Sequence, residues 1–432
     1  MDIQNSEINT AQEGHIAEAA ANKEGAHVKA SEAFSPEIEA QAEVQMAKLR
    51  RGTAEIISDS ELKSKLMRSI RDHKPLRIKL GLDPTAPHIH LGFAVVLRKL
   101  RQFQDFGHQV VIVIGDFTAR VGDPTGRSQT RKVLSVEQIK ANAATYRDQL
   151  SAILDPQKTE VRFNSEWLEN MNFADVITLC SRYTVARIME RDDFTKRFSS
   201  GVSIGVHEFL YPLMQGWDSV QLHSDVEMGG TDQKFNDLVG RELQGQVGQE
   251  PQSVMLMPIL EGLDGVMKMS KSLGNYVGIT ETPQEMFNKL MTLPDDKIRR
   301  YFELCTDTDL EKVDKALGEQ NPRDVKRWLA REIISLYHPA EQAQAADAEW
   351  MRVVSQGAVP TDMEEAEVDQ GPIGIVDLVV KAGLAPSKRE ARRFVTQGAT
   401  SFNGEIVKDP TVSVEVVKES TLKVGKKWRR LI

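Results

Sequence analysis

Two segments that lie far apart in the chain carry side chains suited to binding phosphate. The first, His90-Leu91-Gly92, follows a strand-like run over residues 77–82 and opens a helix-like run over residues 91–106. A helix start offers free backbone N–H groups and the positive end of the helix dipole to an anion. The second, Lys268-Met269-Ser270-Lys271-Ser272, is a loop with two lysines. Either segment alone is typical of a surface histidine or a solvated turn, but the pair indicates a site for the phosphates of ATP.

A loop rich in glycine and aspartate follows the β-branched run over residues 110–114. Asp123 in this loop could pair with a substrate ammonium group, and Arg127 and Arg131 could meet phosphate. An Asp-Pro turn with solvated arginines accounts for the same residues without a site, so both interpretations stay open.

Three polar residues share one face of a later segment. Tyr211, Gln215 and Asp218 recur at helical spacing within an apolar stretch, which predicts a pocket wall ending in an acceptor for a substrate hydroxyl. An amphipathic surface helix is the alternative. The segment Met228-Gly229-Gly230-Thr231-Asp232-Gln233 is expected to be a strand-to-helix turn, whose glycines let a ribose approach and whose Asp232 could bind the ribose hydroxyls.

The elements that must position these residues alternate between strands and helices from about residue 76 to residue 280. This alternation predicts an α/β fold with a Rossmann-like, doubly wound parallel sheet, in which ligands bind beyond the carboxyl ends of the strands. The strand ends expected to matter follow Leu82, Ile114 and Val226. We expect a disordered acidic tail over residues 1–36, a catalytic domain over 37–280, a helical domain over 281–360, an acidic linker over 361–371 and a small α+β domain over 372–432.

Composition narrows the class of protein. The 432 residues carry a net charge of −8, with 40% hydrophobic and 27% charged residues, as in an ordinary soluble protein. No apolar run approaches the roughly 18 residues that cross a membrane, so no membrane partner is expected. The two cysteines argue against a disulfide framework or a cysteine-rich zinc site and predict a cytoplasmic location. The sequence also predicts no metal site of its own.

Positive charge is concentrated near the C-terminus. Residues 372–432 contain 12 Lys and Arg against 6 Asp and Glu, a local surplus of 6 positive charges. A basic helix expected over residues 387–397 gathers Lys388, Arg389, Arg392 and Arg393, which predicts contacts with RNA phosphates. A solvated basic face is the alternative.

In this order, the segments resemble those of bacterial tyrosyl-tRNA synthetases, which are class I aminoacyl-tRNA synthetases, in the branch with a C-terminal S4-like RNA-binding domain. The resemblance covers roughly residues 37–432. It is carried by Gly81-Leu82-Asp83-Pro84-Thr85, His90-Leu91-Gly92, Gly122-Asp123-Pro124-Thr125-Gly126, the Tyr211/Gln215/Asp218 face, Gly229-Gly230-Thr231-Asp232-Gln233 and the lysine loop. It implies ATP as a substrate accompanied by Mg²⁺, tyrosine and tRNA(Tyr) as partners, an anticodon-binding role for the helical domain, and a homodimer.

The resemblance also implies roles for individual residues. Asp123, Tyr211 and Gln215 would hold the tyrosine ammonium group, Asp218 the phenol hydroxyl, and Gln233 would lie near the carboxylate. The nucleotide would contact Gly81, Asp83, Gly92, Gly230, Asp232 and Lys271. The departing pyrophosphate would be stabilised by Thr85, His90, Lys268, Lys271, Arg127 and Arg131. The implied reaction forms tyrosyl-adenylate and pyrophosphate and then transfers the tyrosyl group to tRNA.

Two positions depart from the family pattern. Phe93 stands where the family motif has its second histidine, so any hydrogen bond from that side chain is missing or replaced. Lys79 stands where a phenol-contacting tyrosine is usual, which leaves recognition of the hydroxyl more to Asp218. A tryptophanyl-tRNA synthetase and a non-catalytic RNA-binding paralogue of the same fold are the alternative functions. Comparing pyrophosphate exchange driven by tyrosine with exchange driven by tryptophan would distinguish a tyrosyl-tRNA synthetase from a tryptophanyl-tRNA synthetase. Measured adenylate formation would exclude the non-catalytic paralogue.

Overall fold

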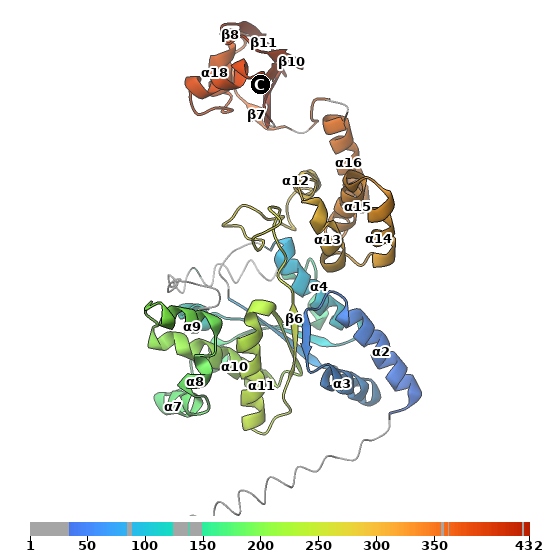
Figure 1. Ribbon diagram of the computed structural model, residues 1–432, viewed down its shortest axis with the longest axis vertical. Helices are drawn as coiled ribbons and strands as arrows, with labels where there is room; N and C mark the ends of the chain where they lie inside the picture. The colour runs from blue at the N-terminus through green and yellow to red at the C-terminus, as the bar shows by residue number, and fades with distance from the viewer. Residues whose placement is uncertain are drawn as a thin grey trace, which may run out of the picture.

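A six-stranded sheet forms the centre of the largest part of the molecule (Figure 1). The computed structural model describes residues 34–83, 89–123, 138, 149–355, 358–361, 363–425 and 427–432. The strands are ordered β1-β6-β5-β2-β3-β4, with β1 antiparallel to β6 and the other neighbours parallel. They are β1 (Glu55–Ile57), β2 (Arg77–Leu82), β3 (Gln109–Ile114), β4 (Thr159–Phe163), β5 (Val226–Gly230) and β6 (Ser253–Met257). The chain moves outward from β2 in both directions, which confirms the predicted doubly wound sheet.

One expected strand boundary is wrong. Val226 begins β5 instead of ending it, and Gly229 and Gly230 still pair with Leu256 and Met257 of β6. The turn therefore starts at η4 (Thr231–Gln233). The physical reason for glycine at position 229 is packing, because a Cβ there would lie 2.4 Å from Asp237 Oδ2.

The pairing between β2 and β5 ends early. These strands pair only where Ile78 lies opposite Val226 and Lys79 opposite Glu227, whereas β2 and β3 pair along the full length of both. The later residues of β2 and β5 therefore diverge at the centre of the sheet. This divergence leaves space between the carboxyl ends of the two strands.

Helices cover both faces of the sheet. On one face, α4 (Leu91–Asp105) packs with Ile78 and Leu80 of β2 in the main hydrophobic core. On the other face, α10 (Leu210–Leu222) and α11 (Lys234–Gln246) pack on each other, and Lys79 reaches α10. Successive side chains of a strand point to opposite faces, so β2 supplies apolar residues to one side and a lysine to the other. The remaining helices of the N-terminal part are α2 (Pro36–Arg50) and α3 (Asp59–Asp72).

A run of short helices separates β4 from α10. They are α6 (Ser165–Leu168), α7 (Phe173–Ser181), α8 (Val185–Ile188), α9 (Asp192–Ser199) and η3 (Val206–Phe209), with η1 (Thr118–Arg120) and η2 (Pro156–Lys158) before them. The buried ion pair between Arg197 and Glu208, at 2.6 Å, joins α9 to η3. Several apolar side chains of this run face solvent instead of a core.

The chain from residue 282 to residue 355 is helical, as the sequence predicts. Thr282 caps α12 in a capping box with Glu285, and Pro283 occupies the first turn. In Figure 1 these helices lie between the sheet and the C-terminal unit. They are α12 (Pro283–Leu290), η5 (Asp295–Lys297), α13 (Ile298–Cys305), α14 (Leu310–Glu319), α15 (Pro322–Ile334), α16 (Ala340–Trp350) and η6 (Met351–Ser355). Among the residues that the structure describes, no helix combines the length and apolar character needed to cross a membrane.

The C-terminal unit has a hydrophobic core of its own. Its elements are β7 (Glu365–Ala366), β8 (Gly371–Gly374), α17 (Ile375–Lys381), α18 (Lys388–Thr396), β9 (Thr400–Phe402), β10 (Glu405–Val407), β11 (Ser413–Val416), β12 (Thr421–Val424) and β13 (Lys427–Leu431). The basic helix predicted over 387–397 is α18, capped by Ser387. The acidic segment 361–371, expected to be a linker, differs from that expectation because it contributes β7, which pairs with β13, and the buried Val368.

Candidate active site

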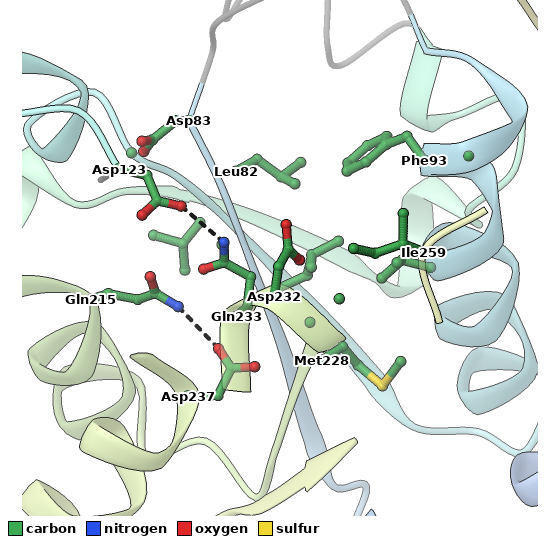
Figure 2. A pocket seen from close by; sticks show the side chains of 18 of the residues that line it. Leu82, Asp83, Phe93, Asp123, Gln215, Met228, Asp232, Gln233, Asp237 and Ile259 are labelled. Atoms are coloured by element: carbon green, nitrogen blue, oxygen red, sulfur yellow. Dashed lines mark hydrogen bonds between the residues drawn. The ribbon is translucent and has the colours of Figure 1, made fainter. Parts of the chain in front are cut away.

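A cavity of about 700 Å³ opens where β2 and β5 diverge (Figure 2). Both strands, the start of α4, the facing sides of α10 and α11, and the loop after β6 line it. This is the place where ligands bind in doubly wound sheets. The sequence-predicted residues that line the cavity are Gly81, Asp83, His90, Gly92, Asp123, Tyr211, Gln215, Asp218, Gly230, Asp232, Gln233, Lys268 and Lys271. Thr85, Arg127 and Arg131 lie outside the described residues.

Asp83 connects the end of β2 to the polar face of α10. Tyr211 Oη donates to Asp83 Oδ2 at 2.9 Å, and Thr118 Oγ1 donates to Asp83 Oδ1 at 3.0 Å. A Cβ at Gly115 would lie 2.2 Å from Asp83 Oδ1, so only glycine leaves room for the carboxylate. Burial, followed by the charges of Asp83 and Asp123, raises the pKa of Tyr211 well above its ordinary value. The Tyr211 hydroxyl therefore keeps its proton and orients Asp83.

Asp218 is a buried carboxyl at another wall of the cavity. Trp167 Nε1 donates to its Oδ1 at 2.8 Å, and Asn164 Nδ2 donates to its Oδ2 at 3.3 Å. Burial raises the pKa of Asp218 from 3.8 to about 7, against the opposing effects of Lys79 and these two hydrogen bonds. A carboxyl held in this way can accept a hydrogen bond from a substrate hydroxyl, because each of its oxygens retains a lone pair.

Asp123, in the loop after η1, and Gln233, at the end of η4, meet at the cavity. Gln233 Nε2 donates to Asp123 Oδ2 at 2.8 Å (Figure 2). Arg191 Nη2 lies 3.8 Å from Asp123 Oδ1. Asn236 Nδ2 donates to Gln233 Oε1 at 3.1 Å and orients the amide. Asp123 is therefore part of a built polar cluster, which favours the binding-site interpretation over a solvated Asp-Pro turn.

Lys79 lies beneath the cavity and does not line it. Its ammonium group pairs with Glu227 at 2.8 Å, and both side chains are almost completely buried. A lysine engaged in this way is directed toward α10 and β5 instead of toward a ligand. This explains how the chain accommodates lysine at a position where the family usually has a tyrosine.

His90 and Gly92 bring the two predicted phosphate segments together. Gly92 N donates to Met269 Sδ at 3.2 Å, and His90 forms a β-bridge with Gly278 beyond the lysine loop. Burial and the nearby charge of Lys271 lower the pKa of His90 to about 4, so the imidazole is neutral at physiological pH. A neutral imidazole still has one N–H to donate to a phosphate oxygen.

The lysine loop has a fixed base. Asn275 Oδ1 accepts from Ser270 N at 2.8 Å, and Asn275 Nδ2 donates to Asp264 Oδ2 at 2.6 Å. Lys268 is exposed, and Lys271 Nζ lies 5.5 Å from the centroid of the Tyr276 ring. The two lysines are thus carried by an anchored loop at the edge of the cavity.

Phe93 belongs to an apolar wall of the cavity. Figure 2 shows its ring on the same side as Ile259 and Met228, away from Asp123 and Gln215. An aromatic ring here offers packing surface where a histidine would offer a hydrogen bond. This wall of the cavity is therefore more apolar than it would be with a histidine at position 93.

Sequence reasoning missed four polar residues of the site: Asn164, Trp167, Thr118 and Asp237. Asn164 directly follows β4, so the rule that singled out residues after Leu82 and Ile114 could have found it. Trp167 lies one helical turn later. Nothing in the sequence indicates that Asp237 belongs to the site, because its position beside the cavity depends on how α11 packs on β5. Lys388, Arg389, Arg392 and Arg393 are all exposed on α18, and none of them lines the cavity.

Two family models match the chain. The model of class I tRNA synthetases (W and Y) matches residues 71–355, and the model of the tyrosine–tRNA ligase SYY-like C-terminal domain matches residues 354–424. A tyrosine–tRNA ligase of Moorella thermoacetica is 54% identical over 393 residues, covering 90% of this chain and 95% of that protein. The chain belongs to the tyrosine–tRNA ligase family. A second member of the family, from Thermotoga maritima, is 51% identical and covers 89% of this chain and 96% of its own.

Solved structures of tyrosyl-tRNA synthetases share the fold of this chain. A C-terminally truncated mitochondrial tyrosyl-tRNA synthetase of Aspergillus nidulans has a TM-score of 0.60 at 23% identity, covering 73% of this chain and 98% of its own. The Archaeoglobus fulgidus tyrosyl-tRNA synthetase complexed with L-tyrosine has a TM-score of 0.57 at 22% identity, covering 71% and 99%. The tryptophan alternative is not favoured, because the curated relatives at about 50% identity are tyrosine–tRNA ligases.

The raised pKa of Asp218 predicts a pH-dependent cost to stability. Its folded pKa of about 7 exceeds its unfolded value near 3.8, so stability falls as pH rises between these values and the loss is complete above about 7. In an Asp218→Asn variant the side chain at position 218 has no proton to gain or lose. As pH rises from 5 to 8, we expect the unfolding free energy of the variant to increase by about 2–4 kcal/mol relative to that of the wild type.

Urea unfolding of both proteins at several pH values measures this difference. Asp192→Asn is the matched control, because the Asp192 side chain is 95% exposed. Stability curves of wild type and Asp218→Asn that stay parallel from pH 5 to pH 8 would contradict the prediction.

Proposed function

We propose that this cavity activates tyrosine with ATP and that the tyrosyl group is then transferred to the 3′ end of tRNA(Tyr) in the cytoplasm. The observation that carries the proposal is the polarity of the cavity. A buried carboxyl, Asp218, stands among fixed donors on one wall, while His90 and the lysine loop stand together on another. A tyrosine hydroxyl fits the first environment, and a triphosphate fits the second.

In the first step the tyrosine carboxylate attacks the α-phosphorus of ATP. A bond forms between a carboxylate oxygen and phosphorus, the bond from phosphorus to the bridging oxygen breaks, and pyrophosphate leaves with the electron pair. The carboxylate is already ionised at neutral pH, so no residue of the protein must act as nucleophile or base. Catalysis then depends on positioning and on stabilising the charge that develops on the phosphates.

We assign the tyrosine ammonium group to Asp123, Tyr211 and Gln215, and the ribose to Asp232 and Gly230. Asp83, held by Tyr211 and Thr118, would face the nucleoside. His90 would donate to the phosphates as a neutral imidazole, and Lys268 and Lys271 would supply positive charge to the departing pyrophosphate. The roles of Thr85, Arg127 and Arg131 in the same event rest on the sequence alone.

Mg²⁺ would accompany ATP on its phosphate oxygens. Over the described ranges, no three His, Cys, Asp or Glu side chains group as a metal site. The proposal therefore assigns no step to the ion and no residue to its coordination.

The function predicts pyrophosphate exchange that depends on tyrosine. A site that bonds a substrate hydroxyl rejects the analogue that lacks it by about 10⁴-fold to 10⁵-fold. Across the twenty amino acids, we expect exchange with tyrosine alone in the wild type. In Asp218→Ala the discrimination against phenylalanine should fall at least about 100-fold, while Asp192→Ala keeps it. Exchange driven by tryptophan, or selectivity unchanged in Asp218→Ala, would contradict the assignment.

We propose that α18 binds tRNA phosphates. Lys388 and Arg393 are paired with Asp377 and Glu390, at 2.6 and 3.0 Å, whereas no ion pair of Arg389 or Arg392 is found among the described residues. The last two arginines are thus the better candidates for phosphate contacts.

An Arg389→Glu/Arg392→Glu variant should lower kcat/KM for tRNA at least about tenfold, because two phosphate contacts are lost and two repulsions gained. Pyrophosphate exchange, which needs no tRNA, should persist. Lys408→Glu/Lys418→Glu, with the same change in charge on exposed residues outside α18, is the control. Equal loss of both activities would remove α18 from tRNA binding.

We also propose that two copies associate through the short helices between β4 and α10. Phe173, Phe198 and Val206 are 80%, 73% and 79% exposed, and Ile177 and Val185 are also exposed. Large apolar side chains gathered on one run of helices are typical of a surface that a partner covers.

Carboxylates introduced at this surface by substitution should prevent the two copies from associating. We expect the wild type to sediment as a dimer and a Phe173→Glu/Val206→Glu variant as a monomer, because burying unpaired carboxylates opposes association. Ile406→Glu/Val417→Glu, with exposed apolar residues of the C-terminal unit, is the control. Dimers that persist in the first variant would place the interface elsewhere.

A further inference from the structure

A group of buried polar side chains lies below the cavity and takes no part in the steps described above. It joins β2, β5, α10, α11 and the start of β6 through Lys79, Glu227, Ser219, Asp237 and Gln252, each of them at most 1% exposed. Buried charges are costly unless they are paired and fully hydrogen-bonded. A cluster of this kind beside the cavity is therefore stable only if its members satisfy one another.

The centre of the group is fully satisfied. Lys79 Nζ contacts Glu227 Oε1 at 2.8 Å, Ser219 Oγ at 2.7 Å and the backbone oxygen of Gln215 at 2.9 Å, which uses all three ammonium protons. Glu227 Oε2 accepts from Ser219 Oγ at 2.9 Å and also from Gln252 Nε2. Glu227 is thus held rigidly from three sides.

Asp237 connects this centre to the cavity, which it lines. Its Oδ1 accepts from Gln215 Nε2 at 3.0 Å, while Glu227 Oε1 accepts from the same nitrogen at 3.4 Å. Burial, followed by the charge of Glu227, raises the pKa of the Asp237 carboxyl well above its ordinary value. Asp237 Oδ2 is buried and has no hydrogen-bond partner among the described residues, so Oδ1 is the oxygen through which Asp237 acts on Gln215.

The orientation of the Gln215 amide follows from these partners. A glutamine amide has one end that donates and one that accepts, and the two ends are distinguished only by their hydrogen-bond partners. Glu227 and Oδ1 of Asp237 both accept, so the nitrogen of Gln215 must face them. Figure 2 shows this nitrogen directed at Asp237 and the amide oxygen pointing away from it.

We propose that Asp237 is a positioning residue that locks the Gln215 amide so that its oxygen, and not its NH₂ group, is presented to the substrate ammonium group. The inference rests on the proposed placement of the tyrosine ammonium group at Gln215. The oxygen attracts the ammonium group, whereas a reversed amide repels it. Asp237 thereby controls recognition of the amino group without touching the substrate.

Two analogues of tyrosine isolate this effect. Tyramine keeps the ammonium group, and 3-(4-hydroxyphenyl)propionate lacks it. In Asp237→Leu, we expect KM for tyrosine and Ki for tyramine in pyrophosphate exchange to rise about tenfold to 100-fold, the value of one hydrogen bond to a charged group. The Ki for 3-(4-hydroxyphenyl)propionate and the KM for ATP should stay unchanged. Asp237→Asn, which keeps an acceptor oxygen, should recover most of the loss.

Two further variants make the result decisive. Val239→Ala removes buried packing from the same helix and takes away no hydrogen-bond partner of Gln215, so it should leave the ratio of the two Ki values unchanged. In a Gln215→Ala background, Asp237→Leu should have no further effect on tyramine, because the two residues act in series. The proposal is overturned if both analogues weaken equally or if Val239→Ala shifts the ratio similarly. Tyrosine-dependent exchange in the wild type tests the proposed function separately, so either failure can be recognised by itself.

Discussion

The ion pair between Lys79 and Glu227 is the interaction on which the site depends. It occupies the last position at which β2 and β5 pair, and beyond it the strands diverge to form the cavity. The same lysine holds α10 through Ser219 and the backbone of Gln215. Loss of one partner from such a buried pair typically costs about 3–5 kcal/mol, because the remaining charge is uncompensated. One pair thus fixes two strand ends and the helix that carries the pocket residues.

The cavity above this pair has opposite electrostatic character on its two sides. Asp83, Asp123 and Asp218 are each held by side-chain donors, so they can face a ligand without rearranging when it binds. His90 and the two lysines stand on the other side. The first backbone N–H groups of α4 are not free there, because Leu91 N donates to Val277 O and Gly92 N donates to Met269 Sδ. Charges fixed in advance stabilise a transition state more than mobile ones, because no reorganisation is needed at the moment of reaction.

Much of the fold and of the site could be predicted because the signals are local. The β-branched run over 110–114 and the spacing of Tyr211, Gln215 and Asp218 each arise from one element and its period. The predicted strand end after Val226 is wrong because β5 continues through Gly229 and Gly230, and strand propensity disfavours glycine. The approach of Asp237 requires glycine at position 229, and the approach of Asp232 requires it at position 230. Trp167 cannot be recognised from the sequence because its role depends on a partner, Asp218, that is far away in the chain.

The sequence by itself determined the doubly wound fold and the family, and it located the two segments predicted to bind phosphate, since each is written in short runs whose order is informative. Only the tertiary structure decided what Lys79 and Asp237 do. Lys79 replaces a residue expected in the pocket, yet it lies below the cavity because Glu227 on a neighbouring strand offers a buried partner. Asp237 reaches Gln215 because α10 and α11 pack face to face. Contacts between elements depend on packing geometry, which no single run of residues encodes.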